Sequence, residues 1–223
     1  TNPISKAVLY DAGFKHPGHT EFIANICKDP TERLDVNPIM MLVGGGLKVA
    51  LATIHVPLSE AISSVTQERL ISVATTVHTA LKTDFGIVSP KIAFSGLNPH
   101  AGENGSIGRE EIETINPAAD LLRRNGINVS DARPADTVFH EALSGQFDAV
   151  IAMTHDQGLI PVKTLDMWGG VNTTLGLPIV RTSPDHGTAY DAAKTGSCRP
   201  DSLIAAIRLA SSIAEHRLKA SNE

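Results

Sequence analysis

The sequence predicts an α/β fold with a mostly parallel sheet and at least one β-hairpin. Short, continuous apolar runs such as residues 147–153 are typical of strands that are buried on both faces. They alternate with segments whose apolar residues recur at helical spacing, as in residues 67–82. Connections between them are short. This alternation favours helices packed on a largely parallel sheet.

The N-terminal half begins with two helices and continues with a hairpin. The expected elements are helices over residues 5–12, 21–28 and 67–82, and strands over residues 38–43, 47–54 and 91–95. Gly13 ends the first helix, and Thr20 is a suitable N-cap for the second. The run Gly44-Gly45-Gly46 provides a flexible turn, so the strands on either side of it should pair as a hairpin.

The C-terminal half repeats the alternation. The expected elements are helices over residues 109–124 and 201–219, and strands over residues 127–129, 147–153, 171–175 and 178–180. Pro117 should kink or split the first of these helices, and Asp201 should cap the second. The positions expected to face the core are Ile112, Ile115, Ala119 and Leu122 in the first helix, and Leu203, Ile207, Ala210 and Ile213 in the second.

Composition places limits on the partners and the compartment. The 223 residues are 42% hydrophobic and 19% charged, which is ordinary for a globular protein with a sizeable core. A net charge of -5 and the absence of a Lys/Arg run predict neither nucleic acid nor a membrane surface as a partner. The two cysteines, Cys27 and Cys198, form no CxxC motif, so the expected compartment is the reducing cytoplasm.

Three histidines follow apolar runs and precede turns or loops. They are His55 in Ala-Thr-Ile-His, His100 in Gly-Leu-Asn-Pro-His and His155 in Ala-Met-Thr-His. Ends of strands in α/β proteins open onto crevices that bind ligands, and neutral imidazole is the commonest side-chain metal ligand. The three are therefore a candidate divalent-metal site. The alternative is that each one is a hydrogen-bonded loop residue, and the residues alone leave both interpretations open.

Charged residues lie near the same loops. Asp136 follows Arg-Pro-Ala, Asp156 is adjacent to His155, Lys163 lies eight residues past His155, and Arg181 ends the expected strand 178–180. Cations at strand ends suit a phosphate or a carboxylate. A turn role for Asp136 and a surface role for Arg181 remain as alternatives.

Two turns could bind anions at helix starts. His19 and Thr20 stand at the start of the second helix, where a phosphate could bind, although a capping turn explains them equally well. The stretch Asp185 to Asp191, with His-Gly-Thr-Ala inside it, could hold the edge of a nucleotide or simply cap a helix. No GxGxxG follows a strand and no GxxxxGK[ST] is present, so the sequence favours neither a Rossmann site nor a P-loop.

Taken together, these segments resemble the 4-hydroxythreonine-4-phosphate dehydrogenase family of pyridoxal phosphate biosynthesis over nearly the whole chain. The matching stretches are Pro-Gly-His19-Thr20-Glu-Phe, Val-Ala-Leu-Ala-Thr-Ile-His55-Val-Pro-Leu, Gly-Leu-Asn-Pro-His100-Ala-Gly-Glu, Arg-Pro-Ala-Asp136-Thr, His155-Asp156-Gln-Gly-Leu-Ile-Pro-Val-Lys163, Gly-Val-Asn172-Thr-Thr-Leu-Gly-Leu-Pro-Ile-Val-Arg181-Thr-Ser and Asp185-His186-Gly-Thr-Ala. Sister enzymes with these motifs oxidise 4-phospho-threonate, 4-phospho-erythronate or cis-dihydrodiols of aromatic acids.

The resemblance implies a role for each matched residue. The implied metal ligands are His55, His100 and His155, shared across a homodimer interface. The implied substrate-binding residues are His19, Thr20, Lys163, Asn172 and Arg181. The implied catalytic residues are Lys163, Asp136 and Asp156, and the implied cofactor-binding residues are His186, Gly187, Thr188 and Ala189. The implied cofactors are NAD or NADP and a divalent zinc, magnesium or cobalt ion.

The implied fold is the two-lobed isocitrate/isopropylmalate dehydrogenase type. In it, residues 1–155 form a central metal-binding and dimerisation lobe, and residues 156–223 form the C-terminal part of the cofactor-binding lobe. The stretch 156–170 is the expected crossing between them. The family's N-terminal segment, with a Gly-Asp-Pro-x-Gly-Ile-Gly loop, has no counterpart in this sequence. Part of the cofactor lobe is therefore expected to be missing, and substrate oxidation to be impaired.

The implied reaction is NAD-dependent oxidation of the C3 hydroxyl of 4-(phosphooxy)-L-threonine. Decarboxylation to 3-amino-2-oxopropyl phosphate follows. The metal polarises the hydroxyl oxygen as hydride leaves. Two other classes of function remain open, a non-catalytic metal-binding dimer and a metal-dependent hydrolase or lyase that uses the same histidines.

Overall fold

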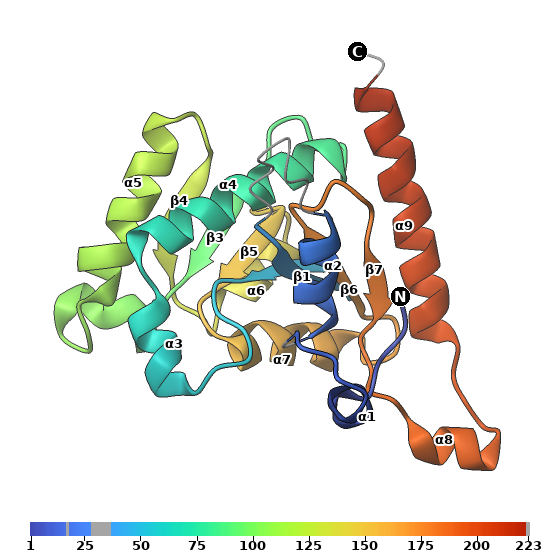
Figure 1. Ribbon diagram of the computed structural model, residues 1–223. Coiled ribbons are helices and arrows are strands. Elements are labelled where there is room, and N and C mark those ends of the chain that lie inside the picture. Colours follow the sequence, from blue (N-terminus) through green and yellow to red (C-terminus); the bar gives the residue numbers. More distant parts are fainter. Residues whose placement is uncertain (17, 28–36, 222–223) are drawn as a thin grey trace.

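The computed structural model describes residues 1–16, 18–27 and 37–221, and one seven-stranded sheet runs through it (Figure 1). The order across the sheet is β4-β3-β5-β2-β1-β6-β7. The strands are β1 (Ile39–Gly44), β2 (Leu47–Leu51), β3 (Ile92–Ser95), β4 (Val129–Arg133), β5 (Ala149–Ala152), β6 (Val171–Leu175) and β7 (Thr182–Pro184).

The sheet has a parallel half and an antiparallel half. Strands β2, β5, β3 and β4 are parallel neighbours, with Val49 opposite Val150 and Ile92 opposite Ala149. Strand β1 pairs antiparallel with β2 as the predicted hairpin, and β6 and β7 continue antiparallel from it. The α/β class and the hairpin are confirmed. The sheet is less parallel than expected, because the hairpin reverses β1 and the last two strands are added beside it.

Helices cover both faces of the sheet, as α/β proteins with parallel strands require. Helices α4 (Gln67–Thr83) and α5 (Asn116–Arg124) pack on one core, which includes Phe94, Ile151 and Met153. Helices α6 (Val138–Leu143) and α7 (His155–Leu165) pack on the other, which includes Val150. Alternate residues of β5 therefore point to opposite cores. The predicted continuous apolar run is confirmed as a strand buried on both faces.

The remaining helices lie at the periphery of the sheet. They are α1 (Lys6–Asp11), α2 (His19–Cys27), α3 (Leu58–Ser64), α8 (Tyr190–Thr195) and α9 (Asp201–Ala220). Helix α9 runs along β7 (Figure 1) and is joined to the end of α4 by the buried Asp84, whose two oxygens accept hydrogen bonds from Arg217 Nε at 2.7 Å and Nη2 at 2.8 Å. None of the helices in the described part of the chain combines the length and apolarity needed to cross a bilayer.

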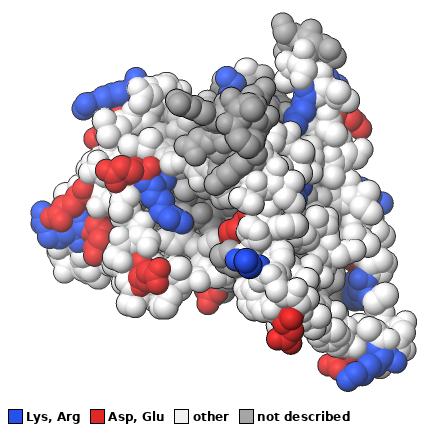
Figure 2. Space-filling view, viewed as in Figure 1, with Lys and Arg blue, Asp and Glu red and all other residues white. Residues whose placement is uncertain are grey.

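Charged side chains on the face seen in Figure 2 are mixed in sign. Lysines and arginines are interspersed with aspartates and glutamates, and no broad field of one sign is visible on this face. The described part of this face offers no concentrated basic footprint of the kind that nucleic-acid binding needs.

Several boundaries differ from the sequence prediction. The strand expected over residues 127–129 shares only Val129 with β4, and Asp201 is the first residue of α9, with Pro200 and not Asp201 at the N-cap. Residues 178–180 form no strand. The last strand instead begins after Arg181, at Thr182, because Pro178 has no N–H for a ladder and Gly176, at φ 76°, turns the chain first. Helix α2 begins at His19, so Thr20 lies in its first turn and is not the N-cap. The stretch 156–170 forms most of α7 and a following turn, and the division into lobes stays a prediction.

The helix predicted over residues 109–124 is split as Pro117 required, and its first part has a different register. Residues Glu111–Ile115 form a π-helical turn ahead of α5. The wider turn rotates the side chains, so Ile112 is 42% exposed and Glu111 is buried. The prediction that Ile112 faces the core is therefore wrong.

The final helix buries less of its apolar face than its spacing predicted. Leu203 is 38% and Ile207 61% exposed, whereas Ser202, Ala206 and Ile213 are buried. The small side chains of Ser202 and Ala206 let α9 approach β7, where Thr182 Oγ1 donates to the Ala206 carbonyl at 2.9 Å. This close approach to β7 determines which face of α9 packs against the sheet.

Candidate functional site

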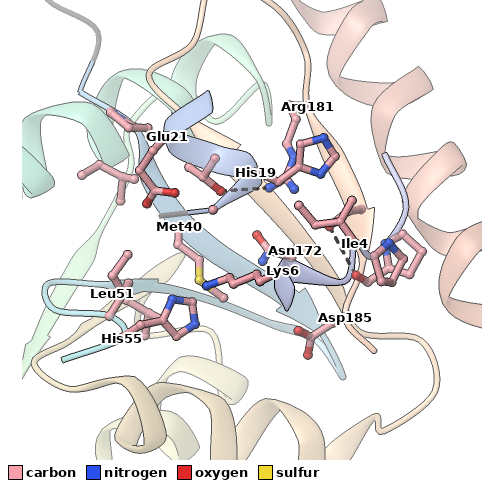
Figure 3. A pocket seen from close by; sticks show the side chains of 18 of the residues that line it. Ile4, Lys6, His19, Glu21, Met40, Leu51, His55, Asn172, Arg181 and Asp185 are labelled. Atoms are coloured by element: carbon pink, nitrogen blue, oxygen red, sulfur yellow. Dashed lines mark hydrogen bonds between the residues drawn. The ribbon is translucent and has the colours of Figure 1, made fainter. Parts of the chain in front are cut away.

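A cavity of about 920 Å³ contains most of the expected substrate-binding residues (Figure 3). It lies between the N-terminal helices, the end of β2, helix α7 and strands β6 and β7. The lining includes eight residues named from the sequence: His19, Thr20, His55, Lys163, Asn172, Arg181, His186 and Gly187. The fold therefore brings these eight residues, which lie up to 168 positions apart in the sequence, into one pocket.

Arg181 is a buried cation at the wall of this cavity. The residue is 7% exposed, and its Nη1 donates to Thr174 Oγ1 at 2.8 Å and to Thr20 Oγ1 at 3.4 Å. No carboxylate of the described residues lies within ion-pair distance of it. Burial lowers the pKa of Arg181, and Glu21 acts in the opposite direction from further away. A guanidinium held by hydroxyls alone retains its capacity to bind an anion.

His19 and Thr20 begin helix α2 beside Arg181. Burial lowers the pKa of His19, and the charges of Arg181 and of the N-terminal amine lower it further. A neutral imidazole can donate one hydrogen bond and accept another. Thr20, with its hydroxyl already accepting from Arg181, can still donate. The two side chains therefore offer donors at the same wall as the guanidinium.

Lys163 and Asn172 complete that side of the cavity. Lys163 Nζ lies 2.9 Å from Asp185 Oδ2 and donates to the Asp185 carbonyl at 3.1 Å. Asn172 lies on β6 opposite Leu42, and its side-chain Oδ1 is buried without a hydrogen-bond partner among the described residues. A buried amide oxygen without a donor is costly, so it marks a place where a ligand can donate a hydrogen bond.

His55 and His155 are brought together because their strands are parallel neighbours. Thr53 Oγ1 donates to the Met153 carbonyl at 2.7 Å, and this bond joins the segments that follow β2 and β5. The two imidazole rings lie 5.2 Å apart between centroids, at an interplanar angle of 46°. Since a zinc–nitrogen bond is about 2.1 Å long, one ion can lie within reach of both rings.

The surroundings of the two rings suit metal ligands. His155 Nδ1 lies 2.8 Å from Asp156 Oδ1, which leaves Nε2 available, as is common for histidines that bind metals. Burial lowers the pKa of His55, with smaller contributions in the same direction from His155 and Lys6. A neutral His55 keeps a lone pair for a ligand.

His100 does not join this pair within one chain. It lies exposed in the 3₁₀ segment Pro99–Gly105, after β3. Within residues 1–16, 18–27 and 37–221, no three histidine, cysteine, aspartate or glutamate side chains form a group that could hold a metal ion. Two of the three expected ligands therefore lie together within one chain, and the three-histidine metal site stays a prediction.

The other expected residues lie at or beyond the rim. Asp136 is exposed in the turn before α6, and Asp156 is exposed at the start of α7, so neither belongs to the cavity lining. Thr188 and Ala189 are exposed in the turn before α8, beyond His186 and Gly187. Ala189 has a left-handed backbone, with φ 50°, and His186 Nδ1 lies 2.8 Å from the Gly187 carbonyl oxygen.

Sequence reasoning missed several residues of the site. Lys6 and Glu21 both line the cavity, and their charges act in opposite directions on the pKa of His55 (Figure 3). Asp185 pairs with Lys163. Gln157 joins the ends of β3 and β5, since its Oε1 accepts from Ser95 Oγ at 2.7 Å and from Met153 N at 2.8 Å. Of these residues, Asp185 could have been recognised from the sequence, because it stands in the turn directly before His186.

Known proteins resemble the chain over almost its full length. The family model for pyridoxal phosphate biosynthetic protein PdxA matches residues 1–210. A 4-hydroxythreonine-4-phosphate dehydrogenase from Maricaulis maris is 56% identical over 217 residues, which are 97% of this chain and 64% of that protein. The chain thus spans less than two thirds of the length of this relative.

Solved structures agree with the family match. The crystal structure of 4-hydroxythreonine-4-phosphate dehydrogenase from Klebsiella pneumoniae is 41% identical with a TM-score of 0.84, over 95% of this chain and 63% of that one. A terephthalate 1,2-cis-dihydrodiol dehydrogenase from Burkholderia xenovorans is 32% identical with a TM-score of 0.72, over 95% of this chain and 65% of that one. The expected isocitrate/isopropylmalate dehydrogenase-like α/β fold is confirmed. By sequence and by fold, the chain belongs to the family of pyridoxal phosphate biosynthetic protein PdxA.

Proposed function

We propose that this chain takes part in the NAD-dependent oxidation of the C3 hydroxyl of 4-(phosphooxy)-L-threonine. Loss of carbon dioxide then gives 3-amino-2-oxopropyl phosphate, in the cytoplasmic synthesis of pyridoxal 5′-phosphate. The observation that carries the proposal is the cavity in which buried Arg181, with no carboxylate partner among the described residues, lies with Lys163 and Asn172 near His55. The names of the relatives support the same reaction.

The phosphate end of the substrate is assigned to the wall formed by Arg181, Thr20 and His19. Arg181 supplies the charge, and its planar fork suits the oxygens of a phosphate. Thr20 and neutral His19 supply further donors. Asn172 Oδ1, buried and without a partner in the described part of the chain, accepts a hydrogen bond from the substrate. These residues fix which end of the substrate lies against β6 and β7.

A divalent ion is assigned to His55 and His155 of one protomer and to His100 of a second copy, so the active form is a homodimer. The 5.2 Å between the two rings and the Asp156 contact to His155 support this assignment. When bound, a zinc, magnesium or cobalt ion would supply Lewis acidity toward the substrate hydroxyl. The exposed position of His100 is compatible with donation to a neighbouring subunit.

Proton transfer is assigned to Lys163, with Asp156 and Asp136 as further candidates. Oxidation removes a hydride from C3 and a proton from its hydroxyl, and decarboxylation then requires a proton at the neighbouring carbon. Lys163, held by Asp185 at 2.9 Å, is positioned to donate that proton from Nζ. Asp156 contacts His155 Nδ1, and both Asp156 and Asp136 are exposed, outside the cavity lining.

The nicotinamide cofactor, NAD or NADP, is assigned to the turn from His186 to Ala189. His186 and Gly187 line the cavity, and no atom lies within 4 Å of a Cβ built on Gly187, so the backbone there is open to a ligand. This turn belongs to the part of the chain assigned to the cofactor lobe, residues 156–223. Residues 1–155 are assigned to metal binding and dimerisation.

Three alternatives to this proposal use the same residues. The likeness to a cis-dihydrodiol dehydrogenase favours oxidation of a carboxylated dihydrodiol, because Arg181 can also bind a carboxylate. The related phosphorylated acids 4-phospho-threonate and 4-phospho-erythronate are substrates of the same kind. A chain that binds metal and dimerises without turnover is the third form of the proposal.

An assay of NAD reduction distinguishes the proposed function from these alternatives. The purified chain is mixed with zinc, cobalt or magnesium and with 4-(phosphooxy)-L-threonine, the two phosphorylated acids or the terephthalate dihydrodiol. We expect slow turnover of the first substrate, which is lost in Arg181→Lys and kept in Arg208→Lys, a change on the exposed surface of α9. Turnover of the dihydrodiol alone would overturn the assignment of a phosphate site. Metal binding without any turnover would leave only the third form.

A further inference from the structure

The segment that carries His100 has an unusual backbone. Five consecutive residues, from His100 to Asn104, have φ between 42° and 76°, and only Gly102 among them is a glycine. The left-handed region is unfavourable for residues with a Cβ. Such a turn persists only where the surrounding structure holds it, and strained backbone of this kind gathers at functional sites.

A buried carboxylate holds the entrance to this turn. Glu111 is 1% exposed, and its Oε1 accepts hydrogen bonds from the backbone N–H of Leu97 at 2.9 Å and of Asn98 at 2.8 Å. Its Oε2 accepts from the side-chain amide of Asn98 at 3.0 Å. All three donors lie within three residues of His100, so one side chain fixes the direction in which the chain enters the turn.

The same carboxylate also packs against the middle of the turn. A Cβ built on Gly102 would lie 2.6 Å from Glu111 Oε2 and 2.9 Å from the Gly108 carbonyl oxygen. The turn therefore closes directly on the carboxylate, and Gly102, at φ 76°, is the residue that permits the contact.

The π-helical turn explains why a glutamate is buried at this position. Residues Glu111–Ile115 form the wider turn that directs Glu111 inward and Ile112 outward. Burying a carboxylate and exposing an isoleucine both cost stability. Single π-helical turns are frequent at functional sites, and the three N–H donors around Glu111 show what the arrangement holds.

We propose that Glu111 is a positioning residue, which holds the left-handed turn so that His100 is presented as the third metal ligand. The inference rests on the proposed function. A second link supports it: Gln157 Nε2, on α7, donates to the Gly96 carbonyl at 2.8 Å. The turn of His100 and the helix that begins with His155 thus belong to one hydrogen-bonded frame.

The test compares Glu111→Gln, Glu111→Ala and Gly102→Ala with the wild-type chain. Glu113→Gln is the matched control, because Glu113 lies on the same π-helical turn but is exposed, and among the described residues its carboxylate pairs only with Arg109. The probe is cobalt(II) alone, followed by its visible absorption. Hydrogen–deuterium exchange of residues 97–105 reports the order of the turn, thermal unfolding reports the fold, and light scattering reports the oligomeric state.

We expect cobalt affinity to fall about 10-fold in Glu111→Gln and up to about 100-fold in Glu111→Ala, the range found for residues that orient metal ligands. Exchange in residues 97–105 should rise in both. Gly102→Ala, which keeps Glu111 and displaces the turn, should show the same loss of affinity. Glu113→Gln should match the wild type in every measurement. The lower cobalt affinity and the faster exchange support the proposal where the unfolding temperature and the oligomeric state of the variant stay near those of the wild type.

The outcomes separate the inference from the proposed function. Wild-type affinity in Glu111→Gln and Glu111→Ala, with faster exchange of the turn, would overturn the positioning role. Unchanged exchange in Glu111→Ala would show that the carboxylate does not hold the turn. His100→Ala distinguishes the two proposals: it should lose affinity while residues 97–105 remain ordered. Wild-type cobalt affinity in His100→Ala, or no cobalt binding by the wild-type chain, would overturn the metal role of His100 itself and the positioning role with it.

Discussion

The buried Arg181 should make the empty site less stable than a neutral replacement, and phosphate should reverse that order. Arg181→Met keeps most of the aliphatic volume and removes the charge. Burying a guanidinium costs several kcal/mol. Its short hydrogen bond to Thr174 Oγ1 at 2.8 Å returns about 2 kcal/mol, and the longer ones, from Nε to Thr1 Oγ1 at 3.2 Å and from Nη1 to Thr20 Oγ1 at 3.4 Å, return less. We therefore expect Arg181→Met to be more stable than the wild type by about 1–2 kcal/mol without an anion.

Inorganic phosphate should stabilise the wild type but not Arg181→Met. At about 100 times the dissociation constant, a ligand specific for the folded state adds about 2.7 kcal/mol, which exceeds the expected advantage of the variant. Thermal unfolding at constant ionic strength, with chloride replaced by phosphate, measures both the stability difference without phosphate and the stabilisation by phosphate. For a chain of this size, each kcal/mol corresponds to about 2–4 °C.

Arg208→Met, at an exposed position of α9, is the control and should respond to phosphate as the wild type does. The reasoning fails if Arg181→Met is less stable than the wild type without phosphate. It also fails if phosphate raises the unfolding temperature of both proteins equally.

Three further changes test other parts of the structure. Asp84→Asn should lower the free energy of unfolding by about 3 kcal/mol, measured in urea, because it leaves Arg217 without its buried carboxylate. Gly158→Ala should cost about 1–3 kcal/mol by the same method, because the new Cβ would lie 2.5 Å from Leu51 Cδ2 and overpack the contact between α7 and the sheet. The lowered pKa of His19 means that the unfolded chain binds more protons below its ordinary value of about 6.5. Stability should therefore fall as the pH drops below that value, and His19→Asn should reduce this slope in urea titrations at pH 7.5 and 5.5.

Each of these three predictions has an outcome that would contradict it. An unchanged urea midpoint in Asp84→Asn would mean that the pair adds nothing to the docking of α9. A more stable Gly158→Ala would show that helix propensity outweighs the close contact. An equal slope in His19→Asn and the wild type would assign the pH dependence to other groups.

The sequence by itself determined the class of the fold and most of its elements. Alternating apolar runs and helical periodicities predicted the strands β1, β2, β3, β5 and β6 and the helices α4 and α9, because those signals depend on residues a few positions apart. The split at Pro117 followed from the chemistry of one residue. The motifs also named eight residues that line the cavity, and His19, Lys163, Asn172 and Arg181 among them stand in recognisable local patterns.

Only the tertiary structure decided which of these residues meet. His55 and His155 approach each other because β2 and β5 are parallel neighbours, a pairing between residues about 100 positions apart that no local pattern contains. The inward position of Glu111 depends on a π-helical turn, which changes the side-chain register without changing composition. The burial of Arg181 beside hydroxyls alone likewise follows from packing. Long-range pairing and register are collective properties of the folded chain, and they turned a set of plausible residues into one cavity.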